Sequence, residues 1–222
     1  MNYTHAFFDL DGTLTDSAPG IINSVCYALK KLGIEPPARE VLTCFIGPPL
    51  SWSFSTYFGM DDAQAARAVD AYREYYRAGG MLENSVYDGV TELLQKLNEA
   101  GVVCVLATSK PHIFANRILQ HFSLDGYFSF VAGPELDGTR GEKSEVIAYA
   151  LEQLGLSDRR SVLMIGDREH DVLGAKQFGM DSAGVLWGFG SEEELMRAGA
   201  TYVCHHTDEV AALFFDDLST KV

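Results

Sequence analysis

Short apolar runs alternate with helix-like segments along most of this chain. Six runs of apolar, β-branched or aromatic residues lie at 6–8, 102–107, 128–132, 162–165, 183–187 and 202–204. Between most of them, apolar residues recur at three- and four-residue spacing, which indicates amphipathic helices. Strands that alternate with helices pair in parallel through right-handed crossovers, and the helices then cover both faces of the sheet. We therefore expect an α/β fold built on a parallel sheet.

One segment interrupts this alternation. From about residue 16 to residue 83 the chain shows helical spacing, at 21–32 and 63–76, and no convincing strand. A crossover between parallel strands needs one helix rather than several. We therefore expect residues 16–83 to form a helical insert in a core made of residues 1–15 and 84–222. Four aromatic residues are expected in the interior of this insert: Trp52, Phe54, Tyr57 and Phe58.

The charge balance narrows the classes of partner. With 17 basic and 31 acidic residues the chain carries a formal net charge of −14. So acidic a protein repels phosphate backbones and anionic lipid, which argues against nucleic-acid polymers and membranes as partners. The apolar runs are far shorter than the about 20 residues that span a bilayer, and the first residues do not resemble a secretory signal. We expect a cytoplasmic protein.

Polar residues follow several of the predicted strands. In an open parallel sheet, ligands bind at the carboxyl ends of the strands. The sequence Asp-Leu-Asp-Gly-Thr at 9–13 follows the first run, Thr-Ser-Lys at 108–110 follows the second, and Asp167 follows the fourth, with Asp171 one helical turn later. Carboxylates gathered at one edge repel each other unless a cation holds them, and oxygen ligands alone suggest Mg²⁺. Hydroxyl and ammonium groups at the same edge make phosphate the natural ligand.

These residues resemble the four signatures of the haloacid dehalogenase superfamily. The run 8–14 is similar to the first signature, Thr108 to the second, Lys143 to the third, and Asp167 with Asp171 to the fourth, in the order of that family. The resemblance covers nearly the whole chain and implies a Rossmann-like core with residues 16–83 as an α-helical cap. Segments 16–20 and 45–50 resemble the phosphoglycolate phosphatase and 5′-nucleotidase-like branch.

The resemblance also implies a chemistry. It suggests a Mg²⁺-dependent phosphomonoester hydrolase that acts on a small phosphorylated metabolite through an aspartyl phosphate. Asp9 would be the nucleophile and Asp11 the general acid and base. Mg²⁺ would be held by Asp9, the main-chain carbonyl of Asp11 and Asp167, while Asp171 would either reach the metal through water or orient Lys143.

Several groups are expected to bind the phosphoryl oxygens. Lys143 is preferred over Lys110 as the third-signature lysine, although the proline that usually follows shortly after it is missing here. Lys110 would then be an additional substrate contact. The expected phosphate-binding residues are Gly12, Thr108, Ser109, Lys110 and Lys143.

Two other functions stay open. A sugar phosphomutase of the β-phosphoglucomutase type needs a cap that holds a second phosphate and keeps water from the aspartyl phosphate. The loop 45–50 contains no arginine, which favours hydrolysis. A binding protein without turnover fits less well, because every catalytic position carries a competent residue.

Two further segments carry expectations about the fold. The insert should pivot about hinges near 15–16 and 84–85 and exclude water when it closes. The sequence Trp-Gly-Phe-Gly at 187–190 follows the fifth run. We expect its glycines to let both aromatic side chains tuck into the core.

Overall fold

A six-stranded parallel sheet forms the core of the α/β part of the protein. The computed structural model describes residues 3–215. The strand order is β5-β4-β1-β6-β7-β8, and every neighbouring pair is parallel, which confirms the predicted α/β, Rossmann-like class. The strands are β1 (His5–Phe8), β4 (Val103–Ala107), β5 (Phe128–Ala132), β6 (Val162–Gly166), β7 (Asp181–Val185) and β8 (Tyr202–Cys204).

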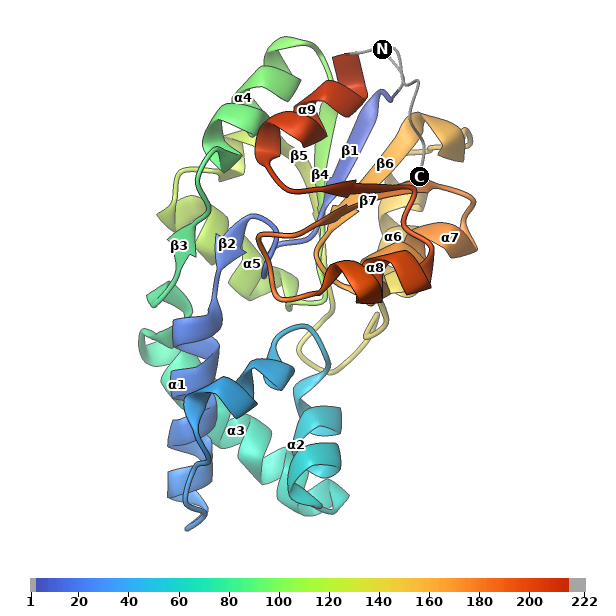
Figure 1. The fold of residues 1–222 in the computed structure, drawn as a ribbon. Helices are drawn as coiled ribbons and strands as arrows, with labels where there is room; N and C mark the ends of the chain where they lie inside the picture. Colours follow the sequence, from blue (N-terminus) through green and yellow to red (C-terminus); the bar gives the residue numbers. More distant parts are fainter. Residues whose placement is uncertain (1–2, 216–222) are drawn as a thin grey trace. The chain divides into compact units, whose positions relative to one another are not determined.

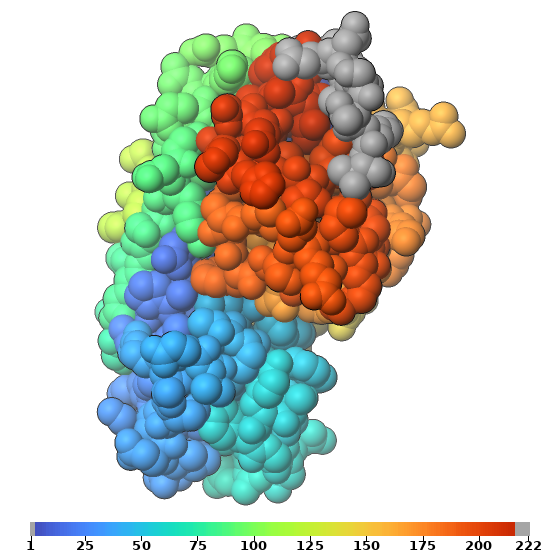
Figure 2. Space-filling model, viewed as in Figure 1, coloured from blue at the N-terminus to red at the C-terminus, as the bar shows by residue number. Residues whose placement is uncertain are grey.

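Helices cover both faces of this sheet (Figure 1). One face packs on α6 and α7 through Phe7, Val105 and Met164, while α4 and α9 pack together on the other. Figure 2 shows the C-terminal segments, coloured orange to red, on the face turned toward the viewer. The helices are α4 (Val90–Glu99), α5 (His112–His121), α6 (Lys143–Gln153), α7 (Glu169–Gln177), α8 (Glu192–Ala198) and α9 (Thr207–Phe215), with short 3-10 turns η3 (Asp125–Tyr127) and η4 (Arg159–Ser161).

The fifth strand lies two residues earlier than its apolar run indicates. β7 pairs with β6 from Leu163↔Asp181 to Gly166↔Gly184 and ends at Val185. The strand begins with the polar residues Asp181 and Ser182, so its start does not appear as an apolar run. Neighbouring strands and helices bury its middle residues. Trp187 therefore falls in the loop after β7, and this placement matters for the site.

Within residues 3–215 the chain divides into two compact units, and the second of them is formed by residues 16–85. Two short strands, β2 (Thr15–Asp16) and β3 (Ser85–Val86), pair where the chain passes between the units. Among residues 3–215, no helix is long and apolar enough to cross a membrane. The second unit holds α1 (Ala18–Lys31), η1 (Arg39–Phe45), α2 (Leu50–Phe58), α3 (Asp62–Ala78) and η2 (Gly80–Leu82).

The second unit has its own interior, in which α1 packs on α3. Phe54 of α2 is fully buried, as expected. Trp52 and Tyr57 are 50% and 46% exposed, so their expected place in the interior is wrong. Phe54 and Phe58 share one face of α2 at i, i+4 spacing, and Trp52 lies off that face.

Candidate functional site

A tight turn after β1 positions the first two carboxylates. The Asp9 amide donates to the Ile165 carbonyl of β6 at 2.9 Å, and the Leu10 carbonyl accepts amide hydrogen bonds from the following turn. Gly12 has a φ of +86°, and a Cβ there would lie 2.2 Å from Asp167 Oδ2. Only glycine fits both the conformation and the space. The Gly12 amide donates to Thr15 within the turn, at 2.9 Å.

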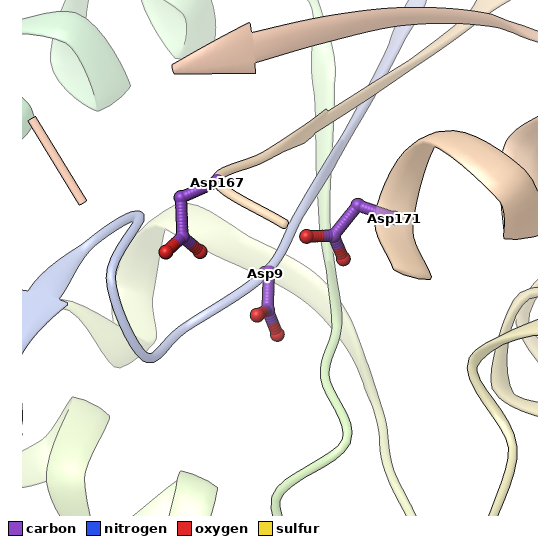
Figure 3. Close-up of side chains that lie close together, drawn as sticks. All are labelled: Asp9, Asp167 and Asp171. Atoms are coloured by element: carbon purple, nitrogen blue, oxygen red, sulfur yellow. The ribbon is translucent and has the colours of Figure 1, made fainter. Parts of the chain in front are cut away.

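Three buried carboxylates converge at the carboxyl edge of the sheet. Asp9 follows β1, Asp167 follows β6, and Asp171 lies in the first turn of α7; each offers an oxygen, and these oxygens lie within 4.8 Å of one another. Figure 3 shows the three side chains close together, with Asp167 and Asp171 on either side of Asp9. Burial, with the charges of Asp171 and Asp9, raises the pKa of Asp167 well above its ordinary value. The cluster therefore holds more negative charge than its surroundings favour.

Lys143 supplies part of the compensation. Its Nζ lies 2.9 Å from Asp9 Oδ1 and 2.7 Å from Asp171 Oδ1, and it donates to the Ala107 carbonyl at 3.0 Å. Burial alone would lower the pKa of Lys143, but the charges of Asp171 and Asp9 outweigh burial and raise it. Lys143 is thus a fixed cation that orients the Asp9 carboxylate.

The start of α6 places Lys143 without the usual proline. Lys143 is the first residue of that helix, and the Glu145 carboxylate accepts the amide hydrogen of Glu142 at 3.1 Å. This reciprocal capping arrangement stabilises the helix start that a proline would otherwise favour.

Asp11 and Lys110 form a second ion pair. Lys110 Nζ lies 2.9 Å from Asp11 Oδ2, with only 6% and 11% of the two side chains exposed. The Thr108 hydroxyl, itself buried, accepts the Lys110 amide hydrogen at 3.1 Å. Ser109, which stands between Thr108 and Lys110 in the sequence, is half-buried. The expected residues thus group as a carboxylate cluster around Lys143 and a pair formed by Asp11 and Lys110.

The loop after β7 also belongs to the site, which the sequence reasoning missed. The Phe189 amide donates to Asp167 Oδ2 at 2.8 Å, and the Trp187 indole donates to the Thr13 carbonyl at 3.0 Å. Trp187 and Phe189 stay half-buried, so the expectation that they tuck into the core is wrong. A Cβ at Gly188 would lie 2.3 Å from the Gly12 carbonyl oxygen. Any side chain at position 188 would therefore prevent this loop from lying so close to the turn after β1. The glycines at 188 and 190 were the sequence signal that could have identified this loop as part of the site.

The carboxylate cluster fits a hard divalent cation. Asp9, Asp167 and Asp171 are at most 7% exposed and offer only oxygen. Lys143 balances one of three negative charges, so a small divalent cation would relieve the remaining repulsion. The donor set suits Mg²⁺ better than metals that prefer nitrogen or sulfur.

Several known proteins are similar to this chain over most of its length. The family model for haloacid dehalogenase-like hydrolases matches residues 6–185. A 5′-nucleotidase of Pseudomonas aeruginosa is 48% identical over 204 residues, which cover 92% of each chain. The tyrosine-protein kinase PtkA of Mycobacterium tuberculosis is 43% identical over 89% of this chain and 67% of its own length. A phosphoglycolate phosphatase of Colwellia psychrerythraea is 30% identical over 86% of this chain and 88% of its own.

Solved structures share the fold over almost the full length. The crystal structure of a predicted phosphatase from Clostridium acetobutylicum superposes with a TM-score of 0.93 at 46% identity, covering 98% of this chain and 100% of that one. A haloacid dehalogenase-like family protein of Streptococcus pneumoniae gives 0.89 at 33% identity, with 96% and 99% covered.

Proposed function

The chain belongs to the haloacid dehalogenase-like hydrolase family and is a phosphatase of that family, and from this premise we propose a two-step mechanism on Asp9. In this proposal the protein hydrolyses phosphate monoesters of small metabolites through an aspartyl phosphate and depends on Mg²⁺. The observation that carries it is the Asp9 carboxylate, buried beside Asp167 and held 2.9 Å from Lys143.

The first step transfers the phosphoryl group to the enzyme. A carboxylate oxygen of Asp9 attacks phosphorus in line, so an O–P bond forms while the bond from phosphorus to the leaving oxygen breaks. Asp11 donates its proton to that oxygen and becomes a carboxylate. Lys143 holds Asp9 in place during the attack.

The second step releases phosphate. A water molecule attacks phosphorus and gives its proton to Asp11, and the bond between phosphorus and Asp9 breaks. Inorganic phosphate leaves, and Asp9 and Asp11 return to their starting forms. The same Asp11 carboxyl group therefore serves as acid in one step and as base in the other.

Mg²⁺ would be held by Asp9, Asp167 and the main-chain carbonyl of Asp11, with Asp171 orienting Lys143 at 2.7 Å. When bound, the metal supplies neutralisation of charge on the phosphoryl oxygens. We assign binding of those oxygens to Thr108, Ser109 and Lys143. The Gly12 amide already donates within its own turn, which makes it a weaker candidate for that task.

Residues 16–85 are proposed to act as the cap that keeps bulk water from the site. The substrate is proposed to be a nucleoside 5′-monophosphate, with phosphoglycolate second. The 5′-nucleotidase relative at 48% identity favours the nucleotide over the phosphoglycolate phosphatase relative at 30%.

The test is a panel of small phosphate esters with two variants. The purified protein should hydrolyse nucleoside monophosphates with Mg²⁺, and Asp9→Asn should lower kcat by about 10⁴-fold or more, since the nucleophile is lost. The control is Asp125→Asn, an exposed carboxylate in η3, which should keep wild-type rates. Unchanged hydrolysis by Asp9→Asn would show that the nucleophile is another residue. A requirement for a sugar bisphosphate to start turnover would favour the mutase instead.

A second candidate follows from the kinase relative at 43% identity. A tyrosine hydroxyl could replace water in the second step, so that its oxygen bonds to phosphorus, its proton passes to Asp11, and the bond to Asp9 breaks. A phosphorylated metabolite would supply the phosphoryl group. Adding a tyrosine peptide to the reaction and measuring phosphotyrosine against free phosphate separates transfer from hydrolysis.

A further inference from the structure

The Lys110 side chain is buried in the site, and its ammonium group lies beside the Asp11 carboxylate. Its side chain is 6% exposed, and its Nζ lies 2.9 Å from Asp11 Oδ2. A lysine that is buried so completely loses its hydration, and an opposite charge close by must compensate. From its position after a strand, Lys110 was expected to be an additional substrate contact. The ion pair points to a different task.

The backbone around Lys110 is fixed on both sides. The Thr108 amide donates to the Ala132 carbonyl of β5 at 3.0 Å, and the His112 amide donates to the Pro134 carbonyl at 3.1 Å. A Cβ at Gly133 would lie 2.5 Å from the Lys110 carbonyl oxygen, so the β5 end touches this turn directly. The ammonium group thus projects from a rigid base.

The two oxygens of Asp11 have different surroundings. Oδ2 faces the Lys110 ammonium, whereas Oδ1 is buried and accepts no hydrogen bond from any residue between 3 and 215. Buried carboxylate oxygens are normally paired, because leaving one unpaired is costly. An unpaired oxygen inside a catalytic site is therefore available to a partner that arrives with the substrate.

We propose that Lys110 is a positioning residue. Its ion pair with Asp11 Oδ2 holds the carboxyl group so that Oδ1 faces the oxygen of the leaving group. This role rests on the proposed function, in which Asp11 gives a proton to that oxygen and takes one from water. Lys110 exchanges no proton itself. It fixes the orientation from which the transfer occurs, and a general acid works only within hydrogen-bond reach of its target.

The role makes a prediction that a phosphate contact does not make. A lysine that binds the phosphoryl oxygens helps every phosphate ester equally, because they share that group. A lysine that positions the general acid matters most when the leaving oxygen is strongly basic and needs a proton, as in an alkyl phosphate. It matters little for p-nitrophenyl phosphate, whose leaving group departs as a stable anion.

The experiment compares kcat/KM for an alkyl phosphate and for p-nitrophenyl phosphate in four proteins: wild type, Lys110→Met, Asp11→Asn and the double variant. We expect Lys110→Met to lose about 100-fold on the alkyl ester and under about tenfold on the aryl ester. In the Asp11→Asn background, Lys110→Met should cost almost nothing more, since the carboxylate that it positions is already gone. Lys176→Met, which removes an exposed lysine of α7, is the matched control and should keep wild-type values.

Equal losses on both esters, repeated in full in the Asp11→Asn background, would overturn the role and make Lys110 a phosphate contact. Unchanged rates in Lys110→Met would also overturn it. A wild-type protein that hydrolyses neither ester would overturn the proposed function and this role with it, so the two failures are distinguishable. Circular dichroism checks folding, and Lys110→Gln carries the same comparison if the methionine variant is unfolded.

Discussion

The Trp187 indole donates a hydrogen bond to the Thr13 carbonyl at 3.0 Å and so joins the loop after β7 to the turn after β1. The same two segments hold Asp167 from both sides. The Thr13 hydroxyl donates to its Oδ1 at 3.3 Å, and the Phe189 amide donates to its Oδ2 at 2.8 Å. The Trp187 hydrogen bond therefore joins the two segments that orient the Asp167 carboxylate.

Trp187→Phe removes that hydrogen bond while keeping an aromatic ring. We expect a loss of about 1 kcal/mol in the free energy of unfolding, as for a typical hydrogen bond. Looser support of Asp167 should also weaken Mg²⁺ binding. Urea unfolding measures the first effect, and calorimetric titration with Mg²⁺ measures the second.

The control for this variant is Trp52→Phe, which changes the only other tryptophan, a half-exposed residue of α2. It should leave Mg²⁺ binding unchanged. Equal Mg²⁺ affinity in Trp187→Phe and Trp52→Phe would contradict a link between the indole and Asp167.

Gly12→Ala tests how tightly the first turn is built around Asp167. The change should cost about 1–2 kcal/mol for the positive φ and about 1–3 kcal/mol more for the overlap with the carboxylate. Gly101→Ala is the matched control, because its φ of +80° is similar but a Cβ there meets nothing within 4 Å. Thermal unfolding should separate the two, and similar losses would show that the turn relaxes freely.

Much of the fold was predictable because it depends on local patterns. Apolar runs and helical spacing indicated the parallel sheet, since buried strands between two helical layers are apolar on both faces. The pattern failed at β7, where Asp181 and Ser182 begin a strand that pairing with β6 creates. Strand pairing depends largely on the neighbouring strands, so the sequence of β7 alone indicates it only weakly.

The site was predictable where chemistry concentrates in side chains. Asp9 and Asp167 follow strands and Asp171 lies one helical turn after Asp167, so the parallel topology brings the three carboxylates together. The contributions of the 187–190 loop come from main-chain and indole groups, whose partners depend on tertiary packing. The sequence alone does not fix the direction of the Lys110 side chain, because a lysine after a strand can reach a ligand or a neighbouring carboxylate equally well.

Metal binding should stabilise the protein by relieving carboxylate repulsion. We expect Mg²⁺ to raise Tm and a chelator to lower it and abolish phosphatase activity. Asp167→Asn should lose the Mg²⁺-dependent rise in Tm, yet its metal-free form should be at least as stable as the metal-free wild type, because a buried negative charge is gone. A differential scanning measurement with and without Mg²⁺ checks both. A wild-type Tm that does not respond to Mg²⁺ would contradict a metal at this cluster.

Glu194 ties α8 to the start of α7, the helix that carries Asp171. Its Oε1 accepts hydrogen bonds from Arg168 Nε at 2.8 Å and from the Glu169 amide at 2.9 Å. Partial burial raises the pKa of Glu194, but these two donors outweigh it and lower the pKa below its ordinary 4.5. The folded state therefore favours the ionised form.

The pH dependence of Glu194→Gln follows from that shift. A depressed folded-state pKa stabilises the protein above the unfolded pKa, and this stabilisation is lost as pH falls through the folded value, where both states are protonated. We expect Glu194→Gln to cost about 1 kcal/mol at pH 7 and much less near pH 3. Glu193→Gln, an exposed neighbour on α8, should change stability little at either pH. Urea unfolding across this range measures the difference, and a cost that stays constant with pH would show that the carboxylate charge of Glu194 does not stabilise the start of α7.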